Sequence, residues 1–206
     1  PALIAGNAVL IKHAEQTRLV GERLAQAFHQ AGLPEERIAN IFIDHPTAET
    51  LLGEGAFDYV NFTGSVEGGR RVERAAAGTF TSMSFELGGK DAGYVMEDAD
   101  LDAAVETLID GAMFNSGQCC CGIERIYVTA TLYDAFVEKA VALTSGYRLG
   151  NPLDETTTIG PMANERFAKT VRRHISDAMG AGAVAHIPTL EGDDGGAYVP
   201  PQILTN

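Results

Sequence analysis

The sequence predicts an α/β protein, with a doubly wound parallel sheet in its first part followed by part of a second α/β domain. Apolar runs of strand length alternate with amphipathic stretches of helix length from residue 8 to residue 87. In such a chain the strands run parallel and the helices cover the sheet. The composition, 45% hydrophobic and 21% charged over 206 residues, is ordinary for a globular chain with a real core.

The first part predicts strands alternating with helices. After the first apolar run, the helical period places Val20, Leu24 and Phe28 on one stripe. Gly32 and Pro34 then end that helix. Expected strands are residues 8–12 (read as buried), 38–43, 58–63 and 82–87, and expected helices are 17–31, 47–53 and 66 to about 77.

After Gly88-Gly89, the second part continues the alternation of apolar strand-length runs and amphipathic helix-length stretches. A helix capped by Asp98 or Asp100 carries a core stripe formed by Leu101, Ala104, Val105, Leu108, Ile109 and Ala112. Further expected elements are strands at 93–96 and 125–129, helices at 131–145 and 164–181, and turn-rich loops at 150–154 and 191–196. We place the domain boundary so that residues 1–87 and 88–206 belong to different domains.

Charge and hydropathy narrow the range of partners and locations. The net charge of −13 disfavours a basic face for nucleic acid. No apolar run approaches the roughly 20 residues of a membrane span, and no signal peptide is visible. We therefore expect neither nucleic-acid nor membrane partners. Three unpaired thiols favour a reducing, cytoplasmic location.

All three cysteines stand side by side in FNSGQCCCG, residues 114–122, here named the nucleophile loop. Neighbouring cysteines cannot staple distant segments, and zinc sites favour spaced pairs with further ligands, so no metal is expected. Adjacent side chains on a helix or strand diverge, so one thiol can face a cleft while its neighbours pack. Flanking glycines and polar side chains favour a nucleophile. Small buried hydrophobes, or a redox-sensing or metal-binding trio, remain alternatives.

Polar residues and glycines follow the carboxyl ends of the predicted strands, where ligands bind in open α/β sheets. Lys12 and Glu15 could bind sugar hydroxyls, or they are solvated surface charges. Gly64 and Ser65 could admit a pyrophosphate at a helix N-terminus, although G-x-G-x-x-G is absent and a bare Gly-Ser turn is more often an ordinary loop. Glu86 is a candidate general base, or a surface carboxylate.

Together these motifs resemble those of the aldehyde dehydrogenase superfamily, and the resemblance runs from residue 1 to residue 206. It implies a Rossmann-like coenzyme domain followed by part of the catalytic domain. It also implies a partial chain that lacks both the N-terminal and the C-terminal parts of a full member. The motifs are PALIAGNAVLIKHAEQT, FTGSVEGG, FELGGK, FNSGQCCCG and GNPLDETTTIGPM.

The resemblance also implies roles for particular residues. The nucleophile stands two positions after Gln118, which makes it Cys120, with Cys119 and Cys121 as packing neighbours. Glu86 falls at the position of the general base. An acidic Glu15 favours NAD over NADP, because it would repel a 2′-phosphate. The implied coenzyme-binding residues are Lys12, Glu15, Gly64, Ser65, Gly69, Leu87 and Gly88.

The implied activity is oxidation of an aldehyde to a carboxylic acid with NAD, through a cysteine thiohemiacetal and a thioester. The full-length protein is expected to be a homo-oligomer. The 206-residue piece alone is expected to be nearly inactive, because the family's side-chain oxyanion donor lies outside it. One alternative is a CoA-acylating semialdehyde dehydrogenase, which would pass the acyl group to CoA. Another is a non-catalytic NAD-binding or structural module.

Overall fold

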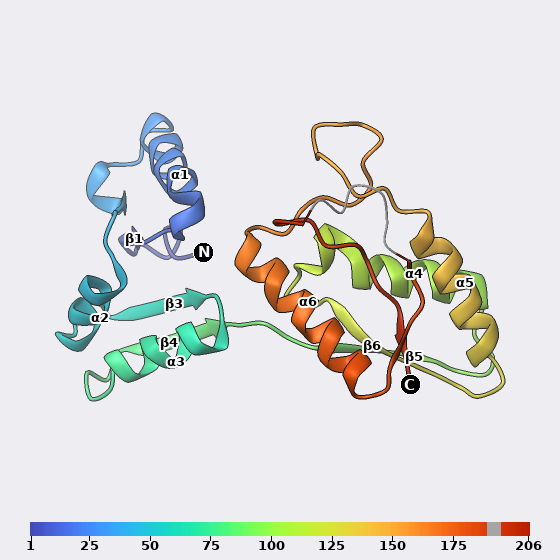
Figure 1. Ribbon diagram of the computed structural model, residues 1–206. Helices are drawn as coiled ribbons and strands as arrows, with labels where there is room; N and C mark the ends of the chain where they lie inside the picture. Colours follow the sequence, from blue (N-terminus) through green and yellow to red (C-terminus); the bar gives the residue numbers. More distant parts are fainter. Residues whose placement is uncertain (189–194) are drawn as a thin grey trace. The chain divides into compact units, whose positions relative to one another are not determined.

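The computed structural model describes residues 1–188 and 195–206 of the chain (Figure 1). The chain divides into two compact units, Pro1–Glu86 and Leu87–Asn206, and each is described by itself. Most of the loop expected at 191–196 lies outside the described residues. The coenzyme and catalytic roles assigned to the two parts stay predictions.

Parallel strand pairs joined through helices build the first unit (Figure 1). Strand β1 (Val9–Ile11) pairs with β2 (Ile38–Asn40), and β3 (Tyr59–Thr63) pairs with β4 (Ser82–Glu86). The α/β class with parallel sheets is therefore confirmed. The helices of this unit are α1 (Arg18–Gln30), α2 (His45–Gly53) and α3 (Val66–Ala75).

The two strand pairs of the first unit are not hydrogen-bonded to each other, although the alternating pattern predicts one continuous sheet. Each pair is parallel, so the first unit contains two separate two-stranded parallel sheets.

Small residues make the contact of α1 with its sheet. A Cβ atom on Gly21 would lie 2.4 Å from the Asn40 Oδ1 of β2, so a larger residue there would force the Asn40 side chain to move. The expected apolar stripe stays largely in solvent, with Val20 56% and Leu24 47% exposed. The expectation that the first strand is buried is wrong, since Leu10 in β1 is 44% exposed.

Side-chain caps start two of the helices in this unit. Asp44 accepts a hydrogen bond from the Thr47 N–H at 2.9 Å and begins α2. Ser65 accepts one from the Gly68 N–H at 3.1 Å and begins α3. Each cap satisfies a backbone donor that a helix N-terminus leaves unpaired.

The second unit packs helices against the parallel pair β5 (Asp91–Val95) and β6 (Ile123–Val128). Its core contains Val95, Val105, Ile109, Phe136 and Ala140. The predicted stripe is confirmed at Val105 and Ile109, which are buried, and Leu101, Ala104 and Leu108 pack against the same core. The remaining elements are α4 (Leu101–Met113), α5 (Tyr133–Ser145), α6 (Glu165–Gly180) and the antiparallel pair β7 (Val184–Ala185) and β8 (Leu204–Thr205).

Asp100 is the cap of α4, because its carboxylate accepts a hydrogen bond from the Ala103 N–H at 3.1 Å. This decides between the two aspartates that the sequence offered. Within residues 1–188 and 195–206, none of the helices has both the length and the apolar character that crossing a bilayer requires.

Candidate functional site

The nucleophile loop begins with an unusual backbone bend at the end of α4. Asn115, Ser116 and Gly117 have φ angles of 51°, 59° and 73°. This left-handed region is unfavourable for residues other than glycine, and asparagine tolerates it best among the others. Consecutive residues in this conformation, in the 3₁₀ turn Phe114–Gly117, stop the helix and lead the chain to the cysteines. Backbone strain of this kind typically gathers at functional loops.

Polar side chains hold this bend in place. The side-chain amide of Gln118 donates to the backbone carbonyl of Asn115 at 3.0 Å. The side-chain amide of Asn115 donates to the backbone carbonyl of Gln118 at 3.2 Å. Two further bonds reach a distant segment. The Ser116 hydroxyl donates to the Gly160 carbonyl at 2.7 Å, and the Ala163 N–H donates to Gln118 Oε1 at 2.8 Å. The loop is therefore anchored to residues 160–163, a support that sequence reasoning missed.

The cysteines form a compact group, which we call the thiol trio (Cys119, Cys120 and Cys121). A hydrogen bond of 3.1 Å from the Gly122 N–H to the Cys119 carbonyl closes a turn over them. Their sulfur atoms all lie within 4.8 Å of one another, and all three residues are exposed. The expectation that Cys119 and Cys121 are packing neighbours is therefore wrong, because a turn gathers side chains that a helix or strand would spread.

Hydrogen bonds within the thiol trio separate the acidities of its members. The Sγ atoms of Cys119 and Cys121 are 3.4 Å apart. The backbone N–H of Cys121, and then its thiol, lower the pKa of Cys119. The same thiol bond, together with the negative charges of its neighbours, raises the pKa of Cys121. These bonds favour a thiolate at Cys119. The nucleophilic role of Cys120 stays a prediction.

A glycine-rich segment runs against the backbone of the thiol trio. A Cβ atom on Gly89 would lie 2.6 Å from the carbonyl oxygen of Cys120, so only glycine permits this approach. Leu87 in this segment is half-buried and Gly88 is exposed. Lys90 completes the segment with an ion pair to Glu124. Within the second unit, Gly89 of the FELGGK motif therefore lies beside the nucleophile loop.

Glu86 is the last residue of β4 and of the first unit, and its side chain is exposed. Its carbonyl oxygen accepts a hydrogen bond from the Gly64 N–H at 3.0 Å. The backbone of the candidate base is thus paired with Gly64, in the Gly64-Ser65 turn that is predicted to bind the pyrophosphate of the coenzyme. In that turn Ser65 caps α3, and the N–H of the buried Gly69 donates to the Ser65 carbonyl at 2.9 Å.

The predicted ribose-binding residues lie directly after β1. Lys12 is half-buried, and Glu15 begins the short 3₁₀ helix Glu15–Thr17. Glu15 forms an ion pair with Arg18 at 2.7 Å, with side chains 77% and 52% exposed respectively. Sequence reasoning missed Arg18, although an acid and a base three residues apart at the start of a helix is a recognisable signal.

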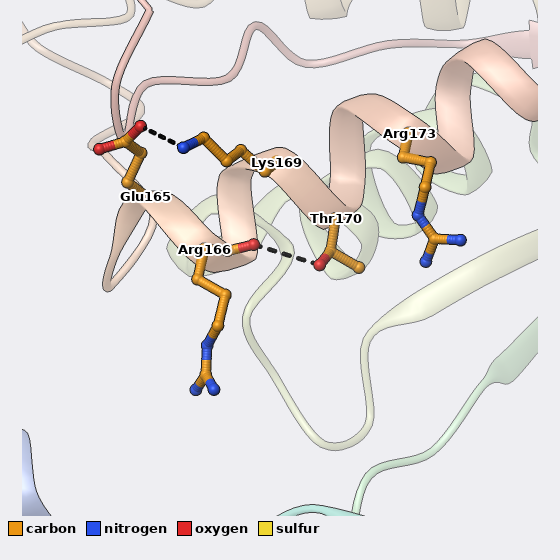
Figure 2. Close-up of a pocket in the computed structure, with 5 residues that line it drawn as sticks. All are labelled: Glu165, Arg166, Lys169, Thr170 and Arg173. Carbon is orange, nitrogen blue, oxygen red and sulfur yellow. Dashed lines mark hydrogen bonds and ion pairs between the residues drawn. The ribbon is translucent and has the colours of Figure 1, made fainter.

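The described residues of the second unit line a cavity and a second, open hollow, and the thiol trio borders neither of these two. A cavity of about 630 Å³ touches the nucleophile loop at Ser116 and Gly117 and has mainly apolar walls. The other lies on the outside of α6, where Figure 2 shows charged side chains along one face. There Lys169 pairs with Glu165 at 2.8 Å, and the Thr170 hydroxyl donates to the Arg166 carbonyl at 3.1 Å. Lys169, Glu165 and Thr170 thus find their partners within the same helix.

The fold and the site define an α/β protein with parallel strands, a capped glycine-serine turn and an exposed cysteine loop packed against a Gly-Gly segment. The chain belongs to the aldehyde dehydrogenase family, which it matches over residues 1–206. The resemblance that the motifs carried is thereby confirmed.

Relatives and solved structures agree with this assignment. The chain is 35% identical over its whole length to succinate-semialdehyde dehydrogenase [NADP(+)] 1 of Mycobacterium tuberculosis, of which it covers 45%. It superposes on a succinate-semialdehyde dehydrogenase from Burkholderia pseudomallei with a TM-score of 0.93 and 33% identity, covering 43% of that chain. A betaine aldehyde dehydrogenase from Staphylococcus aureus in complex with NAD⁺ gives a TM-score of 0.92 at 28% identity. The chain thus spans less than half the length of these proteins.

Proposed function

We propose that the protein to which this chain belongs is an NAD-dependent aldehyde dehydrogenase that converts a small aldehyde to a carboxylic acid through Cys120. The observation that carries this proposal is the close approach of Gly89 to the Cys120 carbonyl. It joins the segment that follows Glu86 to the nucleophile loop. The match to the family over the whole chain supports the same reaction class.

In the proposed reaction the Cys120 thiolate attacks the aldehyde carbonyl and forms a tetrahedral thiohemiacetal. The backbone N–H of Cys120 donates to the developing oxyanion. The bound coenzyme would supply a hydride acceptor, so that a thioester to Cys120 results. Glu86 then takes a proton from water, which attacks the thioester and releases the acid.

The residues present suit a nicotinamide dinucleotide. The capped N-terminus of α3, with Gly64 and Ser65 in front of it, offers backbone donors and a favourable dipole to a pyrophosphate. Lys12 and Glu15 stand beyond the carboxyl end of β1, where a ribose would bind. Gly69, Leu87 and Gly88 complete the coenzyme-binding set that we propose.

The choice of coenzyme rests on Glu15. Its carboxylate would repel the 2′-phosphate of NADP, which supports NAD. Two observations weigh on the other side: the Arg18 guanidinium at 2.7 Å partly offsets that charge, and the Mycobacterium tuberculosis relative is named for NADP. We propose NAD as the preferred coenzyme because Glu15 places a carboxylate just beyond the carboxyl end of β1, where the ribose would bind.

The remaining proposals concern the alternatives and the setting of the protein. Glu86 favours hydrolysis over transfer to CoA, because transfer needs no base to activate water. The net charge of −13 supports the absence of nucleic-acid partners, and the unpaired thiols support a cytoplasmic location. We also propose that the 206-residue chain alone is nearly inactive and that the whole protein is a homo-oligomer.

Turnover of the intact protein tests this function. Cys120→Ala should lower kcat by on the order of 10³ or more, because it removes the nucleophile. Cys119→Ala, the matched control, should stay within about tenfold, because no bond forms at that sulfur. Glu86→Gln should slow acid release by about 10²–10⁴ while the first turnover of NADH persists. The short chain should run at least about 10² slower than the intact protein.

Three results would contradict the proposal. If Cys119→Ala abolishes turnover and Cys120→Ala does not, the nucleophile is misassigned. Acyl-CoA as the product, formed equally well by Glu86→Gln, identifies the CoA-acylating alternative. Binding of NAD with no aldehyde oxidation in the intact protein identifies a non-catalytic module.

A further inference from the structure

The thiol trio has the arrangement of a metal-ligand set. Its three sulfur atoms lie within 4.8 Å of one another. Among the described residues 1–188 and 195–206, it is the one group of three or more histidines, cysteines or carboxylates whose ligand atoms gather so closely. The turn closed by the hydrogen bond from the Gly122 N–H to the Cys119 carbonyl puts the three side chains together.

The spacing of the sulfur atoms suits a soft divalent ion. Zinc binds thiolates at about 2.3 Å in tetrahedral geometry, which places neighbouring sulfurs about 3.8 Å apart. The Cys119 and Cys121 sulfurs, at 3.4 Å, would need to open by only a few tenths of an ångström. The other separations are at most 4.8 Å, and rotation of exposed side chains can close them.

We propose that the thiol trio is an inhibitory site for zinc or another thiophilic divalent ion, which all three cysteines bind together as thiolates. Binding releases the thiol protons and changes no oxidation state. No histidine or carboxylate joins the group among the described residues. The ion therefore keeps an open fourth position for water, which suits reversible occupation. This inhibition rests on the proposed role of Cys120, because a sulfur that ligates the ion cannot attack an aldehyde.

The test uses the 206-residue chain with a non-thiol reductant and Co²⁺ as a coloured substitute for Zn²⁺. The thiolate-to-cobalt absorption should saturate at one ion per chain, with the intensity of three thiolates, and added Zn²⁺ should displace the cobalt. Cys119→Ser and Cys121→Ser should each lower the intensity to that of two thiolates and weaken binding at least about tenfold.

The controls make the assignment specific. The triple serine variant, checked for its fold by circular dichroism, should show no thiolate absorption. Asp154→Asn removes an exposed carboxylate from the same unit and should leave the titration unchanged. Equimolar Zn²⁺ should also slow iodoacetamide labelling of Cys120 at least about tenfold, and a chelator should restore it.

The proposed ion site is overturned if the thiolate-to-cobalt absorption of the wild-type chain has the intensity of only one or two thiolates. It is also overturned if the triple serine variant binds Co²⁺ as tightly as the wild type. These readouts need neither aldehyde nor coenzyme. If they hold while Cys120→Ala keeps full turnover in the intact protein, the ion site stands and the proposed function fails. If turnover depends on Cys120 but no three-thiolate complex forms, the proposed function stands and the ion site fails.

Discussion

The acidity of individual thiols is the residue-scale feature on which the chemistry depends. Hydrogen bonds from Cys121 favour the thiolate at Cys119, while the nucleophile that we propose is Cys120. A low pKa alone does not select a nucleophile, because nucleophilicity falls as pKa falls and access to the electrophile also counts. All three cysteine residues are exposed. The position of the aldehyde, rather than acidity, should then decide which sulfur reacts.

Coenzyme choice is a second residue-scale property, and it centres on Glu15. In the intact protein, Glu15→Ser should raise kcat/KM with NADP relative to NAD by on the order of tenfold. Removing a like charge near a 2′-phosphate is worth about 1 kcal/mol or more. Steady-state kinetics with both coenzymes measure this ratio. Glu36→Ser, an exposed acid elsewhere in the first unit, is the control, and an unchanged ratio in Glu15→Ser would remove Glu15 from the coenzyme site.

Helix caps are the element-scale feature that sets where α2 and α3 of the first unit begin. The hydroxyl and backbone N–H of Thr47 both donate to Asp44 and lower its pKa, in that order of importance. Because the pKa is lower in the folded state, the stability that this cap contributes is present above the unfolded value of about 3.9. That contribution is lost as the pH falls through the lower folded value.

Asp44→Asn tests the titration of this cap, because asparagine caps helices about as well as aspartate but carries no proton to titrate. The urea midpoint of the first unit should fall more steeply in the wild type than in Asp44→Asn between pH 5 and about pH 3. Urea titrations at several pH values, followed by circular dichroism, measure the difference. Parallel pH curves for the two proteins would show that the cap does not titrate in this range.

Loop geometry is the element-scale feature that local sequence patterns predict least well. Strand and helix positions followed from apolar periodicity, and the structure places helix α4 and its Asp100 cap close to where the pattern put them. The thiol trio did not follow from periodicity, because its side chains are gathered by a turn. The supports of that turn, Ser116 to Gly160 and Gln118 to Ala163, join residues 44 and 45 positions apart, which local patterns cannot show.

At the scale of the whole molecule, the fold class and the family were predictable because the motifs run through the entire chain. The continuity of the sheet was not, because strand order is set by non-local pairing. Burial was overestimated in the first unit, where Leu10 and Val20 stay exposed even though their period is that of a core face. Periodicity shows which face of an element is apolar, but not whether another element covers it.

Trapping the acyl-enzyme tests the central claim most directly. The intact protein carrying Glu86→Gln would be mixed with aldehyde and NAD, quenched in acid, digested and analysed by fragment-ion mass spectrometry of the peptide that contains the thiol trio. We predict one acyl group per chain, bonded to the sulfur of Cys120. An acyl group on Cys119 or Cys121, or unmodified thiols after NADH has formed, would contradict the account.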